Sequence, residues 1–207
     1  FLRERDVPIF FGIVLFIYPL LASPAESFSF AVVGDNPYGD ANVSKYERLI
    51  DQVNSTAEIE WVIHLGDVKA GQEDCSDKEI LRRFHLNQKF SVPLIVTPGD
   101  NDWLDCKREA AGAFNEYERL EYFRQIFYPK RGFSTGGKPM ELSQQSEGAD
   151  FSEFVENSLW EYESIVFAAV HVVALTSPAT DPAQKIKRDN AAAAWITNAF
   201  RLAKEKG

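Results

Sequence analysis

Three Gly-Asp dipeptides, each placed directly after a short apolar run, constrain the fold of this chain most. They are Gly34-Asp35, Gly66-Asp67 and Gly99-Asp100, and the apolar runs that lead into them begin at Phe28, Trp61 and Pro93. A short apolar run that ends in such a turn is typical of a buried strand. Segments with helical spacing follow the turns. Strand, loop and helix in alternation predict an α/β fold with parallel strands and right-handed crossovers.

The spacing of apolar residues predicts the other elements. We expect helices over 43–54, 77–90 and 117–127, the first capped by Asn42 or Ser44 and the second opened by a capping box of Ser76 and Glu79. An antiparallel pair of strands is predicted over 159–162 and 164–176, and a last helix over about 189–203. Residues 129–150 lack an apolar period, so we predict an irregular excursion near the mouth of the cleft.

Composition limits the class of partner. The chain has 207 residues, 45% of them hydrophobic, with a formal net charge of -9, which is the make-up of an ordinary globular domain. An acidic surface repels a phosphate backbone, so we expect no nucleic-acid partner. A small phosphorylated substrate remains compatible with this charge, because bound divalent cations invert the field inside a single cleft.

The first 25 residues have the pattern of an export signal. Arg3 and Arg5 precede an apolar run over 8–21, and small residues follow at Ser23 and Ala25. We therefore predict a signal peptide over 1–25 and one domain over 26–207, in a periplasmic or secreted protein. The run is shorter than the roughly 20 residues that span a bilayer, so no stable membrane insertion is expected after cleavage. An uncleaved anchor is the alternative.

The two cysteines agree with export. Cys75 and Cys106 lie on the loops that follow the second and third Gly-Asp turns, and such loops emerge at the same edge of a parallel sheet. An even number of cysteines in an exported chain is compatible with one structural disulfide. A pair of thiolate metal ligands is the alternative, but no CxxC spacing accompanies them.

The three aspartates suggest a metal site. Asp35, Asp67 and Asp100 follow strands whose carboxyl ends are expected to meet at one edge of the sheet. Three carboxylates gathered there repel one another unless a positive charge lies between them. Two divalent metal ions, manganese, iron or zinc, would supply that charge and activate a water molecule. For any one dipeptide taken alone, a solvated turn or a helix cap is the alternative.

Five other side chains are weaker candidates. His64 and His171 lie inside apolar strands and are interpreted as hydrogen-bonded core histidines, whereas His85 is expected on a solvated helix face. Lys69 lies close enough to Asp67 to reach a phosphate, and a surface lysine is the alternative. Trp103 either stacks on a substrate or packs beside its turn.

At these turns the sequence resembles the calcineurin-like metallophosphoesterase family. Its signature is Asp-x-His, then Gly-Asp-x-x-Asp, then Gly-Asn-His-Asp/Glu, each after a strand, and the likeness covers most of 28–207. It implies a layered αββα sandwich in which Asp35 and Asp67 are metal ligands, the latter bridging two ions. Asp100 stands where the family has an Asn ligand, and Asn101 where it has the His that contacts the phosphate.

The chain also departs from the family pattern. Pro37 stands at the first His position and Ala70 at the second acidic position, and Asn36, Tyr38 or Asp40 are candidates to replace the lost ligand. Asn101 cannot titrate, so it is expected to donate a hydrogen bond to the phosphate but not a proton. The later His ligands of the family have no counterpart before the end of this sequence. The C-terminal part of the sandwich is therefore expected to be missing.

The resulting prediction is a metal-dependent hydrolase of phosphate esters that uses a water molecule activated by two metals. Asp35, Asp67 and Asp100 are its predicted metal ligands, and Asn101 is its predicted phosphate contact. The alternative is a noncatalytic exported binding protein on a degenerate metallophosphoesterase scaffold. The substrate, the metal and the oligomeric state do not follow from the sequence.

Overall fold

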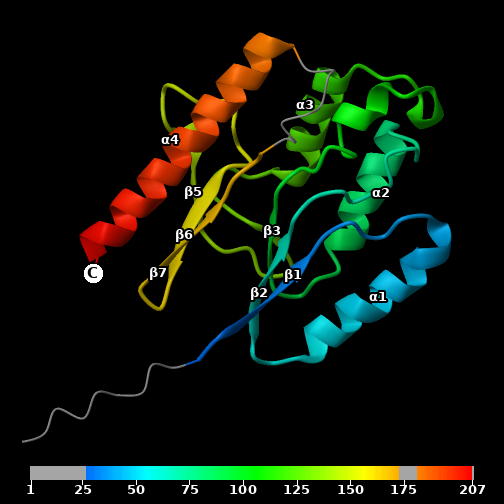
Figure 1. The fold of residues 1–207 in the computed structure, drawn as a ribbon. Coiled ribbons are helices and arrows are strands. Elements are labelled where there is room, and N and C mark those ends of the chain that lie inside the picture. Colours follow the sequence, from blue (N-terminus) through cyan, green and yellow to red (C-terminus); the bar gives the residue numbers. More distant parts are fainter. Residues whose placement is uncertain (1–26, 173–180, 207) are drawn as a thin grey trace, which may run out of the picture.

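The computed structural model describes residues 27–172 and 181–206, and within them two β-sheets stack face to face between outer helices (Figure 1). The first sheet contains β1 (Ser29–Val33), β2 (Ile59–His64), β3 (Pro93–Val96) and β4 (Thr135–Gly136), in that order. β1, β2 and β3 run parallel, as predicted, and β4 is antiparallel to β3. The predicted signal peptide lies outside the described residues.

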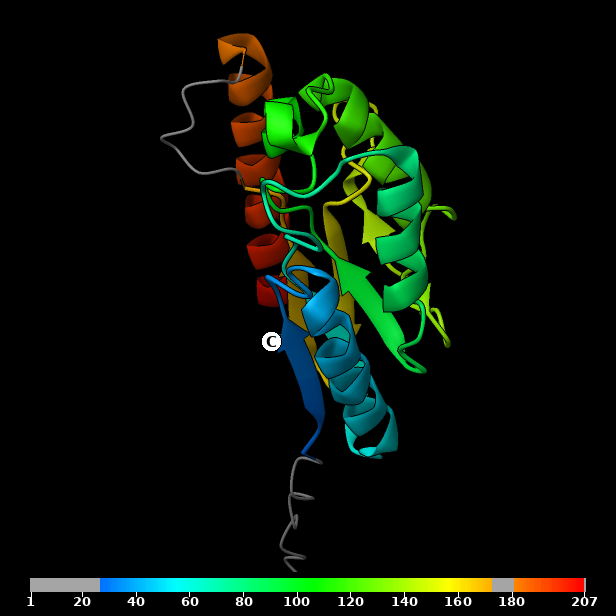
Figure 2. The same ribbon diagram turned by 90° about the vertical axis from the view of Figure 1, so that its right-hand side faces the viewer.

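The second sheet is antiparallel and contains β5 (Ser143–Gln144), β6 (Ser158–Tyr162) and β7 (Ile165–Ala169). The predicted strand pair is thus confirmed, although β7 ends at Ala169 and residues 173–176 of the predicted second strand lie outside the described residues. The helix α4 (Pro182–Lys206) lies along this sheet (Figure 2) and is longer than predicted.

The remaining helices cover the other face of the first sheet (Figure 1). They are α1 (Asp40–Ser55), α2 (Asp77–Asn87) and α3 (Glu116–Phe127). The described residues also contain three short 3-10 helices, η1 (Leu104–Lys107), η2 (Glu109–Ala111) and η3 (Gln145–Glu147). This helix, sheet, sheet, helix order gives the layered α/β sandwich that the sequence predicts.

Two apolar layers hold the sandwich together. One lies between the first sheet and α1, α2 and α3, and includes Val62, Leu94 and Phe123. The other lies between the two sheets, where Trp61 of β2 packs edge-on against Trp160 of β6, with ring centroids 6.1 Å apart. Burying these aromatic side chains fixes the second sheet on the first and leaves the carboxyl ends of the parallel strands to form the site.

The helix starts show what the sequence predicted and missed. α1 begins three residues earlier than predicted, after Gly39, and no side chain caps it. The predicted cap by Asn42 or Ser44 was wrong, because both residues lie inside the helix and Asn42 Nδ2 donates to the carbonyl oxygen of Tyr38 at 2.7 Å. In α2, Ser76 caps the start as predicted, and its Oγ accepts from the N–H of Glu79. The other half of the predicted capping box is absent, because the N–H of Ser76 donates to Asp74 and the Glu79 carboxylate is taken by Arg82 and Arg83.

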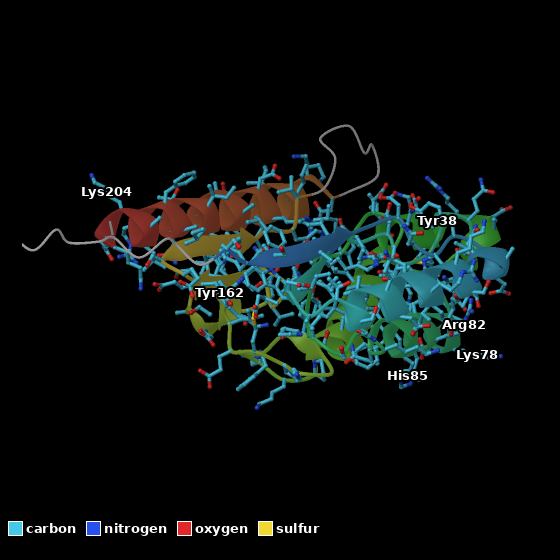
Figure 3. All side chains as sticks on the ribbon, turned by 90° about the horizontal axis from the view of Figure 1, so that it is seen from below. Tyr38, Lys78, Arg82, His85, Tyr162 and Lys204 are labelled. Atoms are coloured by element: carbon cyan, nitrogen blue, oxygen red, sulfur yellow. A yellow bond between two sulfur atoms is a disulfide. The ribbon has the colours of Figure 1, made fainter. Side chains whose placement is uncertain are left out.

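The predicted position of residues 129–150, near the mouth of the cleft, was wrong. It forms β4, β5 and η3, and its residues 140–143 line a cavity of about 610 Å³ beside the beginnings of β2 and β3. Tyr162 also lines this cavity, and Figure 3 shows it far from Tyr38, which follows the first Gly-Asp turn. The segment therefore lies away from the predicted site. Its hydrogen bonds to the sheets, which the sequence pattern does not encode, determine this position.

Cys75 and Cys106 form a disulfide, which confirms the predicted pairing and excludes thiolate metal ligands. The bridge closes 31 residues of chain and joins the loops after β2 and β3. Both side chains are fully buried.

The described residues contain no helix that is long and apolar enough to cross a membrane.

Replacing both cysteines by serine is expected to lower the free energy of unfolding by about 3 kcal/mol, because the open chain regains the entropy that the closed loop removes. Urea denaturation of the oxidised wild type and of the double variant measures the difference. An unchanged midpoint would contradict a structural role for this bridge.

Candidate active site

The second and third Gly-Asp turns pack directly against each other. Gly66 has φ +91°, and a Cβ added to it would lie 2.1 Å from the backbone nitrogen of Gly99. A Cβ on Gly99 would lie 2.0 Å from Oδ1 of Asp67. Only glycine permits this approach of the two backbones. The glycines therefore explain why the turns that follow β2 and β3 meet.

The backbone of the first two aspartates is strained. Asp35 and Asp67 have φ of 56° and 55°, in the left-handed region that residues with a Cβ rarely adopt. The first turn is tied to the second, since the N–H of Asp35 donates to the carbonyl oxygen of Gly66 at 3.2 Å. Strain of this kind gathers at functional sites, where the surrounding structure holds it in place.

The buried carboxylate of Asp102 joins the second and third Gly-Asp turns by hydrogen bonds. Its side chain is 1% exposed, and its carboxylate accepts the backbone N–H groups of Asp67, Val68 and Gly99 at 2.8–2.9 Å. Burial raises the pKa of Asp102 to about 7, and the N–H of Gly99 opposes the rise. These three bonds fix the position of Asp67. Asp102 stands at the acidic position that ends the third turn of the family motif.

Tyr38 lies at the centre of the polar groups. Its hydroxyl oxygen is 2.8 Å from Oδ1 of Asp35 and 3.2 Å from Oδ2 of Asp67, and it accepts from Nδ2 of Asn101 at 3.1 Å. The backbone N–H of Asn101 donates to the other oxygen of Asp67 at 3.0 Å. Burial, and then the hydrogen bond to Asp35, raise the pKa of Tyr38 well above its ordinary value.

The three predicted aspartates line one cavity. Asp35, Asp67 and Asp100 share it with parts of the strand ends and with residues 170–172, and its volume is about 310 Å³. Burial raises the pKa of Asp67, and the nearby charges of Asp100 and Asp35 add to the rise. The strand ends thus bring together the residues that the sequence selected.

The oxygen donors at this edge of the sheet are of a kind that binds divalent cations. Asp35 and Asp67 each direct one oxygen to the same phenol, and hard oxygen donors of this kind suit divalent cations. Within 27–172 and 181–206, no group of three or more His, Cys, Asp or Glu side chains is arranged to hold a metal ion. The carboxylate oxygens at this edge are thus of a kind that suits a divalent cation, but the described residues show no complete set of metal-binding side chains.

Three of the weaker candidates are buried and contact other protein groups. Lys69 is fully buried, contrary to the predicted surface position, and its Nζ donates to the carbonyl oxygens of Ala70 and Glu73, each at 3.2 Å. Trp103 is also fully buried, so it packs beneath its turn. His64 is buried as predicted, and its Nδ1 accepts the N–H of Gly66 at 3.1 Å.

His171 is a buried, hydrogen-bonded histidine, as predicted, and it belongs to a polar network whose other members the sequence did not identify. It lines the cavity of the three aspartates, and its Nδ1 is 2.9 Å from Oε1 of Glu156. Glu156 also accepts two hydrogen bonds from Arg124, at 2.7 and 3.0 Å. The burial of Glu156 favours its neutral form, but its bond to His171 and the charge of Arg124 outweigh burial and lower its pKa to about 2.

This network predicts a loss of stability in acid. Because the folded pKa of Glu156 is about 2, below its ordinary value of 4.5, its stabilising contribution is present above pH 4.5 and is lost as the pH falls toward 2. Burial also lowers the pKa of His171, so protonation of the unfolded chain acts in the same direction. Denaturant unfolding from pH 6 to pH 2 should show this slope, and Glu156→Gln should flatten it. Parallel curves would contradict the assignment.

A comparison with protein families agrees with this geometry. The family model described as calcineurin-like phosphoesterase matches residues 28–182, which include all three Gly-Asp turns and both sheets. The chain belongs to the calcineurin-like phosphoesterase family. The family resemblance inferred from the turns is therefore confirmed. No curated protein and no solved structure gives a significant match.

For a calcineurin-like phosphoesterase, the chain keeps the Gly-Asp turns of the motif and departs from it at neighbouring side chains. The strand-end turns are present, whereas Pro37 and Asn101 replace imidazoles. The sequence had left Asn36, Tyr38 and Asp40 open as replacements for the first of these. Asn36 Nδ2 donates to the carbonyl oxygen of Gly34, and Asp40 pairs with Arg82 outside the site. Of the three, Tyr38 is the residue that contacts Asp35 and Asp67.

Proposed function

We propose that the chain hydrolyses small phosphate esters in a metal-dependent reaction, with Asp35, Asp67 and Asp100 as metal ligands. The observation that carries this proposal is the cavity that all three side chains share at the carboxyl ends of β1, β2 and β3. Membership of the family supports it. A bound divalent metal, manganese, iron or zinc, would supply a Lewis acid and lower the pKa of a water molecule there.

The chain's own residues have separate tasks in this proposal. Asp67 is held by its N–H bond to Asp102 and by the N–H of Asn101 on its Oδ1, so its other oxygen keeps a fixed direction. Asn101 donates one amide hydrogen to Tyr38, and its second amide hydrogen is the proposed donor to a phosphate oxygen. Fixed donors of this kind stabilise charge that develops in the transition state.

Hydrolysis of para-nitrophenyl phosphate tests the proposal. The chain, stripped with a chelator and then supplied with manganese, iron or zinc in turn, is expected to release nitrophenol with at least one of them and to lose this activity again on chelation. Equal rates with and without metal would contradict metal dependence. No hydrolysis with any of the three would overturn the enzymatic proposal for this chain.

A second candidate is a noncatalytic binding protein on the same scaffold. One observation favours it: within the described residues, no three His, Cys, Asp or Glu side chains are grouped so that they could hold a metal ion. Binding of inorganic phosphate to a hydrolytically inactive chain, measured by calorimetry, would support this alternative.

Export is proposed on two observations. The N-terminal pattern over 1–25 is that of a signal peptide, and the buried disulfide is a bond that persists in oxidising compartments. Expression of the full chain with a reporter at its C-terminus in a Gram-negative host tests it. The reporter is expected in the periplasm or medium, and retention in the cytoplasm would contradict export.

A further inference from the structure

We propose that a second cavity of the chain binds a small oxyanion, a phosphate or carboxylate group, with Arg188 as its anchor. The cavity has a volume of about 270 Å³ and lies between α3 and the first turns of α4, which meet at the same end of the molecule (Figure 1). None of the three aspartates of the candidate active site lines it. The inference is therefore independent of the proposed phosphoesterase activity.

Two helix faces form this cavity. α3 contributes residues 117, 120, 121 and 124, and α4 contributes residues 184, 187 and 188. Spacings of three and four residues place each set on one face of its helix. Glu153, from the segment before β6, completes the lining. The cavity thus belongs mainly to two regular elements, which hold their side chains in fixed relative positions.

The guanidinium of Arg188 is buried and lacks an acceptor. Arg188 is 4% exposed, and its Nη2 has no hydrogen-bond partner among the residues that the structure describes. Burial lowers the pKa of Arg188, and the charge of Glu156 opposes this effect, but both oxygens of Glu156 already accept from Arg124. An arginine keeps its charge in proteins. A buried charge without a partner is strongly unfavourable, and an anion in the cavity would remove this cost.

The acidic side chains that line the cavity are paired with other cations. Glu121 pairs with Arg124 at 2.6 Å, and Glu153 pairs with Lys187. The lining therefore contains three cations and two acids, and the two acids are taken by Arg124 and Lys187. Arg188 is the cation for which this described lining provides no acid.

The surroundings of Arg188 leave its N–H groups available to a ligand. Its guanidinium carbon lies 4.7 Å from the centroid of the Trp103 ring. Such a contact uses the flat face of the guanidinium and leaves the N–H groups at its edge for an oxyanion. The hydroxyl oxygen of Tyr117 accepts the N–H of Asp181 at 2.9 Å, so its own hydrogen can serve as a second donor. The exposed amide of Gln184 provides a third.

These donors define the class of ligand. A guanidinium presents two parallel N–H groups that match two oxygens of a phosphate or a carboxylate. A spherical anion such as chloride cannot accept both bonds with this geometry. Phosphate and acetate are therefore the probes of the site, and chloride is the control for charge alone.

Isothermal titration calorimetry of the metal-free chain with sodium phosphate and with sodium acetate, at an ionic strength held constant with sodium chloride, tests the inference. Without metal, the cavity of the three aspartates repels an anion, so it does not contribute to binding. Wild type is expected to bind at least one probe, and the tighter one identifies the preferred group. Arg188→Met should weaken this binding about tenfold or more. Binding of neither probe by wild type would overturn the inference.

The matched control is Arg201→Met, since Arg201 also lies on α4 but is exposed, pairs with Glu205 at 2.6 Å and does not line the cavity. It should keep the affinity of wild type, and equal weakening in both arginine variants would assign the effect to net charge and reject the site. Tyr117→Phe removes the second donor while keeping the ring, and should weaken binding about threefold or more. Unchanged affinity in folded Arg188→Met, or in Tyr117→Phe if Arg188→Met does not fold, would also overturn the inference.

Discussion

Replacing Gly66 by alanine is expected to lower the free energy of unfolding by about 4 kcal/mol, because two costs add at this position. Its φ of +91° is unfavourable for alanine, and the new Cβ would lie 2.1 Å from the backbone nitrogen of Gly99. Backbone cannot give way as a flexible side chain does, so the second and third turns must separate. Urea denaturation gives the value.

Gly39→Ala is the matched control. Gly39 also has positive φ, +72°, but nothing lies within 4 Å of an added Cβ. Its φ of 72° and ψ of 150° lie in a region open almost only to glycine, so it should show the conformational cost alone, about 1 to 3 kcal/mol. The difference between the two variants isolates the contact between the turns. Equal losses in both would mean that the close packing of Gly66 on Gly99 does not contribute to stability.

The second large effect is expected on activity. Asp67→Asn should reduce kcat/KM for para-nitrophenyl phosphate about 1,000-fold in the presence of metal, since it removes the charge of a proposed ligand while keeping its shape. Asp51→Asn, on the exposed face of α1, is the control of equal chemistry and should retain wild-type kinetics. Activity retained in Asp67→Asn would show that hydrolysis does not depend on this carboxylate.

The sequence predicted the framework because the relevant physics is local. Short apolar runs that end in Gly-Asp specify strands and turns, and parallel strands bring their carboxyl ends to one edge. This sufficed to place Asp35, Asp67 and Asp100 on one cavity. The disulfide followed in the same way, since the two loops that carry Cys75 and Cys106 leave neighbouring strands.

Other features depend on contacts between distant segments, which no local pattern records. Lys69 looks like a surface lysine in the sequence, yet the loop folds over it and gives its Nζ two carbonyl acceptors. The role of Asp102 depends on N–H groups from another turn. Tyr38 was one of three open candidates, and only the positions of two carboxylates and an amide around its hydroxyl distinguish it.

The central claim is that the Gly-Asp turns form a metal site. Equilibrium dialysis with zinc and with manganese, on wild type and on the Asp35→Asn/Asp67→Asn double variant, tests it most directly. We predict that wild type retains at least one of these ions and that the folded double variant retains neither. Equal metal content in the two proteins, or a metal-free wild type, would contradict the account.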